Sequence, residues 1–205
     1  MARDGTAAEN TALLIVDLQN DFLHPRGAYA RGGQASADIA GLPERVLPVA
    51  DAVRACGAWV VSTQFTLVPG KDGEPLISPH LKALRPFLGK GDFAPASWGN
   101  SLVDELRPAD LVVEKVAYSA FFMTRMEWVL RRAGIRALYV AGIVTNGGVA
   151  STVRDAHVRD FDITVLSDGC AAFRREVHET SLADLGTICR IVTCAEAAAE
   201  LRGET

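Results

Sequence analysis

Short apolar segments rich in β-branched residues alternate along the chain with longer segments of helical periodicity. Six apolar segments are predicted to be buried strands, at residues 11–19, 58–64, 110–115, 137–144, 162–168 and 189–194. Amphipathic spacing predicts helices over residues 42–57, 125–134, 148–161, 175–186 and 195–202. This alternation is typical of helices packed on both faces of a parallel sheet. We therefore predict an α/β protein with a three-layer α/β/α, Rossmann-like fold and a mainly parallel six-stranded sheet.

The 205 residues suit one domain, which we predict to span residues 1–205. One long segment, residues 66–100, lacks clear periodicity and is rich in Pro and Gly. Irregular segments of this length inside a domain are usually functional. We interpret it as a loop or lid over a site rather than as a linker between domains.

Composition excludes several classes of function. The net charge is −4, and no basic patch with interleaved aromatic residues predicts binding to nucleic acid. No apolar run has membrane-spanning length and no signal peptide is evident, so we expect a cytoplasmic protein that acts on a small molecule. The four cysteines form no CxxC pair and are predicted to be reduced. The four histidines are far apart in the sequence, with His157 and His178 expected on helix surfaces, so we predict no metal and no cofactor.

Polar residues stand where several of the predicted strands end. Ligands of open parallel sheets bind beyond the carboxyl ends of the strands. We expect Asp17, Gln64, Lys115, residues 144–148 and Asp168 to converge there.

Three of these side chains suit catalysis or binding, although each also has a structural explanation. Asp17 follows an apolar strand and could act as an acid or base, or could cap the next turn. Lys115 could pair with Asp17 or bind an anionic group, or could be a surface lysine. Gln64 could bind a substrate carbonyl or could simply face water.

Two glycines in "GIVTNGGVAS" precede a predicted helix. Glycine lets the backbone approach a ligand, and the amide groups at a helix N-terminus attract anions and oxyanions. Because this pattern is common, it is only a weak indication of a site.

Five ordered motifs resemble the isochorismatase-like hydrolase superfamily, also called the cysteine hydrolases. They are "LLIVDLQNDF", "VVSTQ", "VVEKVAYSAFF", "VAGIVTNGGVASTVRDA" and "DITVLSDGCAAF". The resemblance implies an Asp–Lys–Cys catalytic triad whose first two members are Asp17 and Lys115. The third falls on Gly148, which cannot attack a carbonyl. We further predict a substrate site formed by Phe22, Gln64, Tyr118, Val144, Thr145 and Asn146.

Glycine at the nucleophile position is similar to the isochorismatases proper. That likeness implies hydrolysis of an enol ether, in which Asp17 protonates a methylene carbon, Lys115 stabilises charge and Gly148 leaves space. Residues 144–146, Val-Thr-Asn, instead resemble the amidase branch. A carboxylated substrate would also need a cation near Gln64, and Lys71, Lys82 and Arg85 are available in the long segment.

Three functions therefore remain open. The first is a cysteine-independent hydrolase of a small, carboxylated substrate of the enol-ether type. The second is hydrolysis of an amide or other carbonyl compound by water that Asp17 activates, and the third is a catalytically silent ligand-binding protein.

Two structural expectations accompany the resemblance. The Val144–Thr145 peptide is predicted to be cis. A homodimer or larger homo-oligomer is also predicted, because aromatic residues gather around the lysine motif and the long segment. These aromatic residues are Trp98, Phe121, Phe122 and Trp128.

Overall fold

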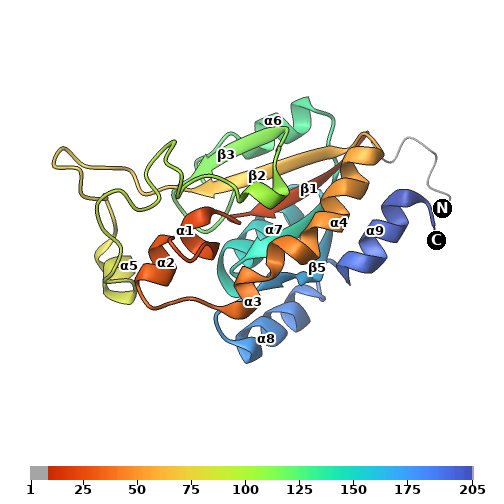
Figure 1. Cartoon of the computed structure of the whole chain (residues 1–205). Coiled ribbons are helices and arrows are strands. Elements are labelled where there is room, and N and C mark those ends of the chain that lie inside the picture. Colours follow the sequence, from red (N-terminus) through yellow and green to blue (C-terminus); the bar gives the residue numbers. More distant parts are fainter. Residues whose placement is uncertain (1–8, 205) are drawn as a thin grey trace.

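Six parallel strands form one sheet in the order β3-β2-β1-β4-β5-β6 (Figure 1). A computed structural model describes residues 9–204, so the remaining ends of the predicted 1–205 domain lie outside the described residues. The strands are β1 Thr11–Val16, β2 Trp59–Phe65, β3 Leu111–Lys115, β4 Ala137–Ile143, β5 Asp162–Ala171 and β6 Arg190–Val192. The predicted α/β fold and its six-stranded parallel sheet are confirmed.

Helices cover both faces of the sheet and complete the three predicted layers (Figure 1). Leu13 and Ile15 of β1 pack on the side of α4 and α9, whereas Leu14 and Val16 pack on the opposite side. Alternate side chains of a strand point to opposite faces, and burial of both faces explains why β1 is apolar throughout. The long helices are α4 Leu42–Ala55 and α9 Cys194–Arg202 on one side, and α6 Met126–Arg132, α7 Ala150–His157 and α8 Arg175–Leu185 on the other.

Five short helices were not predicted from the sequence. Three of them have four residues, too few for a helical period to be visible. The five are α1 Asn20–Leu23, α2 Ala28–Arg31, α3 Ala37–Ala40, α5 Pro79–Leu84 and the 3₁₀ helix η1 Asp104–Leu106.

The segment 66–100 extends beyond the carboxyl ends of the strands and includes α5 (Figure 1). A small apolar cluster holds it to the body of the protein, with Phe93 fully buried against Tyr29, Leu67 and Leu88. The segment therefore covers the edge of the sheet at which ligands are expected.

Candidate active site

Asp17 follows β1 directly and turns into the interior at the edge of the sheet. Its backbone has a φ of +57°, and only 4% of the residue is exposed. One carboxylate oxygen, Oδ2, lies 2.6 Å from Lys115 Nζ. The other, Oδ1, accepts a hydrogen bond of 2.6 Å from the Thr63 hydroxyl. The carboxylate is therefore held by two neighbouring strands.

Lys115 is the last residue of β3, and it is 2% exposed. Besides the ion pair, its Nζ donates a hydrogen bond of 2.9 Å to the Ala117 carbonyl and lies 5.5 Å from the ring centroid of Phe65. A buried charge must be paired and hydrogen-bonded, and Lys115 meets both conditions. The predicted contact between Asp17 and Lys115 is confirmed.

Gly148 faces this pair from the loop after β4. Residues Thr145–Val149 form the short π-helix η2, which leads into α7. A Cβ atom on Gly148 would lie 3.4 Å from Asp17 Oδ2 and 3.3 Å from Val16 Cγ1. It would also approach the Ile143 carbonyl oxygen to 2.7 Å, closer than real Cβ atoms come. A side chain at position 148 would thus point at Asp17, but the present backbone leaves it too little room.

One expectation about this loop is wrong in detail. The cis bond joins Ile143 and Val144, at the end of β4 and one residue earlier than predicted. The Gly147 and Val149 amides donate to the Val144 carbonyl, at 2.9 and 3.2 Å. These two amide groups bond within the loop and are not directed at a ligand.

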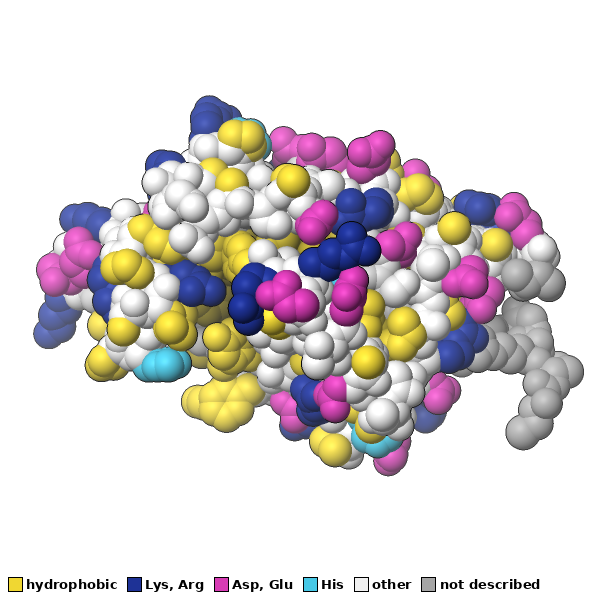
Figure 2. Space-filling model, turned by 90° about the horizontal axis from the view of Figure 1, so that it is seen from below, with side chains coloured by type: hydrophobic (Ala, Val, Ile, Leu, Met, Phe, Trp, Pro, Cys, Tyr) yellow, Lys and Arg dark blue, Asp and Glu magenta, His cyan; other side chains and the backbone are white. Residues whose placement is uncertain are grey.

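A cavity of about 270 Å³ opens beside Asp17, Lys115 and Gly148. Figure 2 shows a hollow with hydrophobic side chains at its floor, next to the end of the molecule that carries α5. Helix α5 supplies Leu81 and Leu84 to one wall of the cavity. The aromatic residues that line the cavity are Phe22, Tyr29, Phe65, Tyr118 and Phe173.

Arg85 is the second cationic side chain that lines the cavity, after Lys115. Its guanidinium carbon lies 5.9 Å from the ring centroid of Tyr29 and 5.6 Å from that of Phe173. These two rings stack on each other at 5.4 Å, and Arg85 Nε donates to the Tyr29 hydroxyl at 3.3 Å. Of the three cations considered from the sequence, Lys71 is exposed and Lys82 donates to the Leu88 carbonyl, so Arg85 alone lines the cavity.

Only some of the predicted substrate-site residues line the cavity. Phe22, Tyr118 and Val144 do so. Gln64 does not, because Thr63 and Phe65 face the site and side chains alternate along β2. This placement corrects the prediction for Gln64.

Thr145 and Asn146 also lie away from the cavity. The Thr145 hydroxyl is 2.7 Å from His178 Nδ1 on α8, and Asn146 is exposed. A helical turn points successive side chains in different directions, so consecutive residues of η2 cannot all face one ligand. Tyr29, His80 and Phe173 line the cavity and were missed, because no pattern in the sequence connects them with β1, β3 and β4.

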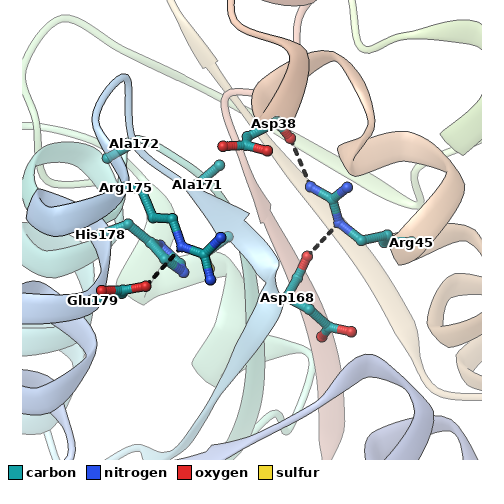
Figure 3. A pocket seen from close by; sticks show the side chains of 9 residues that line it. Asp38, Arg45, Asp168, Ala171, Ala172, Arg175, His178 and Glu179 are labelled. Atoms are coloured by element: carbon teal, nitrogen blue, oxygen red, sulfur yellow. Dashed lines mark hydrogen bonds and ion pairs between the residues drawn. The ribbon is translucent and has the colours of Figure 1, made fainter.

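The four cysteines are free thiols, and none of them lines this cavity. Cys170 lines a separate cavity of about 250 Å³ beside β5 (Figure 3). Burial raises the pKa of its thiol to about 12, so it is not a thiolate near neutrality. Cys170 is therefore not placed to act as a nucleophile in the cavity beside Asp17.

Within residues 9–204, no group of three or more His, Cys, Asp or Glu side chains could hold a metal ion. The same part of the chain contains no helix that is long and apolar enough to span a membrane.

Comparisons with known proteins agree with this architecture. The Isochorismatase domain profile matches residues 11–197. A ureidoacrylate amidohydrolase RutB of Acinetobacter baylyi is 34% identical over 194 residues, which cover 88% of this chain and 79% of that protein. One from Azorhizobium caulinodans is 37% identical over 172 residues, covering 77% and 74% of the two chains.

Solved structures share the fold. A cysteine hydrolase from Pseudomonas syringae superposes with a TM-score of 0.82 at 23% identity, covering 100% of this chain and 98% of that one. An isochorismatase family protein from Desulfovibrio vulgaris gives a TM-score of 0.77 at 26% identity, with 94% and 98% covered. The profile match and the curated relatives show that this chain belongs to the isochorismatase family within the cysteine hydrolase superfamily, and that it is a hydrolase.

Proposed function

We propose that this hydrolase cleaves a small carboxylated molecule in the cavity, with Asp17 as the acid or base and water as the nucleophile. The observation that carries this proposal is the buried Asp17–Lys115 pair, which faces a residue without a side chain. A glycine cannot form an acyl-enzyme, so no covalent bond to residue 148 is involved.

Arg85 is the reason to expect a carboxylate on the substrate, because it is available to bind one. Among the described residues, no Asp or Glu lies within ion-pair distance of its guanidinium, whereas Lys115 is already paired with Asp17. Arginine matches the geometry of a carboxylate, with two parallel hydrogen bonds. The aromatic residues around it would stack on a flat, unsaturated substrate.

Hydrolysis of a C–N bond is the first candidate reaction. Asp17 would act as the general base and take a proton from a water molecule as the water oxygen adds to the carbonyl carbon. When the tetrahedral intermediate collapses, the C–N bond breaks and Asp17 passes that proton to the leaving nitrogen. The relatives named ureidoacrylate amidohydrolase make a ureido acid the first substrate to test.

Hydrolysis of an enol ether is the second candidate, and the lack of a side chain at Gly148 favours it. Here a protonated Asp17 would protonate the terminal methylene carbon, and water would add to the resulting oxocarbenium ion and return a proton to Asp17. The hemiketal would then release pyruvate and an alcohol. This route differs from the first in needing a proton on Asp17 at the start.

Parallel assays separate the candidates. Loss of ureidoacrylate supports the first and pyruvate release from isochorismate supports the second. In both, Asp17→Asn should reduce kcat by about 10²–10⁴-fold. Asp51→Asn, an exposed carboxylate on α4, is the matched control. Full activity in Asp17→Asn would refute the proposed catalyst, and binding of both compounds without turnover would indicate a silent ligand-binding protein.

A further inference from the structure

A second cavity lies beside β5 and α8. Side chains from α3, α4, β5 and α8 line it (Figure 3). One of them, His178, is half-buried rather than on the helix surface as predicted. Its Nδ1 lies 2.7 Å from the Thr145 hydroxyl oxygen, so the cavity is connected to the loop that carries Gly148 through one hydrogen bond.

Thr145 is fully buried at the first position of η2, three residues before Gly148. In the described part of the chain, His178 is the hydrogen-bond partner of its hydroxyl. A buried hydroxyl that loses its partner costs more free energy than the bond itself is worth. His178 therefore stabilises the loop at the point where it leaves β4.

We infer that His178 is a positioning residue that acts by holding Thr145. The hydrogen bond to Thr145 would keep Gly148 against Asp17, and it would keep Val144 in the wall of the substrate cavity. His178 does not line that cavity and would act only through the loop. The effect on turnover rests on the proposed function, whereas the effect on the loop does not.

The direction of this hydrogen bond depends on the tautomer of His178. An unprotonated Nδ1 accepts from the Thr145 hydroxyl, whereas a protonated Nδ1 donates to the hydroxyl oxygen. Burial is the largest influence on the pKa of His178 and lowers it from the usual 6.5. The nearby carboxylates oppose the shift and the arginines assist it.

The charged groups that act on His178 are Glu179 and Arg175 on α8, Asp38 on α3 and Arg45 on α4 (Figure 3). Because the pKa is lower in the folded protein, the stabilisation from His178 is complete above about pH 6.5 and is lost as the pH falls below that value.

Kinetics of His178→Ala and His178→Gln test the positioning role. His178→Ala should lower kcat about tenfold while KM changes less than twofold, the effect expected from one lost hydrogen bond. His178→Gln, whose side-chain amide can accept a hydrogen bond from the Thr145 hydroxyl or donate one to it, should recover most of that loss. It should also lose any decline of kcat between pH 6.5 and 5 that the wild type shows. His157→Gln, on the exposed side of α7, is the control and should match the wild type.

Hydrogen exchange tests the loop without any substrate. The Gly147 and Val149 amides donate to Val144, so their exchange rates report opening of η2. We expect about tenfold faster exchange in His178→Ala and in Thr145→Val, and wild-type rates in His157→Gln. Unchanged exchange in both variants would overturn the inference, whatever the kinetics show. Faster exchange in a protein that turns over neither substrate would uphold the inference and count against the proposed function alone.

Discussion

At the scale of one residue, the proposed chemistry depends on Gly148. Its missing side chain would point at Asp17 Oδ2, the oxygen that Lys115 contacts. In the proposed function, the Asp17–Lys115 pair therefore has no nucleophilic side chain at position 148 to activate, and water would be the nucleophile.

Gly148→Cys should impair the native reaction rather than improve it. The new Cβ would meet the Ile143 carbonyl oxygen at 2.7 Å, so the loop must shift and Val144 with it. A displacement of about 1 Å can reduce kcat roughly 10²-fold. Gly186→Cys, where a Cβ would have ordinary contacts, is the control for the added thiol. The comparison requires kcat for both variants, and a kcat at or above wild type in Gly148→Cys would show that the space is not needed.

A trace of amidase activity in Gly148→Cys is a separate expectation. The thiol would lie beside the Asp17–Lys115 pair, and neighbouring cations and helix N-termini lower the pKa of a cysteine. Rapid labelling by iodoacetamide would detect the thiolate, and a panel of small amides would detect turnover.

Among the elements, the short helices near the cavity depend on Asp21 in α1. Its Oδ1 accepts from the Ala28 amide at 3.0 Å and its Oδ2 from the Phe93 amide at 2.7 Å. The carboxylate therefore joins α1 to the start of α2 and to the segment 66–100. A Cβ on Gly99 would lie 2.1 Å from Oδ2, so the segment also packs directly on this group.

Asp21→Asn should lower the free energy of unfolding by about 1–3 kcal/mol. The new amide group cannot accept one of the two backbone protons, which is left buried without a partner. Urea denaturation measures the loss, and the exposed Asp51→Asn is the control. An equal stability of the two variants would show that Asp21 does not anchor the segment.

Helix α9 begins with a capping box. The Thr193 hydroxyl accepts from the Glu196 amide at 3.2 Å, and the Glu196 carboxylate accepts from the Thr193 amide at 2.7 Å. Thr193→Ala should cost about 0.5–2 kcal/mol of stability in urea denaturation. Thr180→Ala, within α8, removes a hydroxyl that bonds only the carbonyl four residues earlier, so it should be neutral or slightly stabilising.

On the scale of the whole molecule, we propose a homodimer as the smallest assembly. Exposed apolar side chains gather in one stretch beside the cavity, and such patches are typical of interaction surfaces. They are Val116, Tyr118, Phe122, Met123 and Trp128. Of the four aromatic residues considered from the sequence, Phe121 is buried against Phe161 and takes no part in this surface.

Phe122→Glu should shift a dimer toward monomer, because it places a charge in an apolar contact. Val158→Glu, at an isolated exposed position, is the matched control and should leave the mass unchanged. Light scattering at micromolar concentration measures both variants. A wild-type monomer would refute the assembly.

The sequence by itself determined the layers of the fold and the two charged members of the site. Strand β1 is buried and apolar throughout, so its end is marked by Asp17, the polar residue that follows, and Lys115 is the polar residue that ends β3. Tertiary structure alone decided which other groups reach the cavity. The direction of a side chain on β2 or η2, and the approach of Arg85, Tyr29 and Phe173 from distant segments, depend on packing. Local sequence cannot encode these contacts, because each is set by the position of another element. For the same reason His178 was expected to be a surface residue and only the folded chain brings it to Thr145.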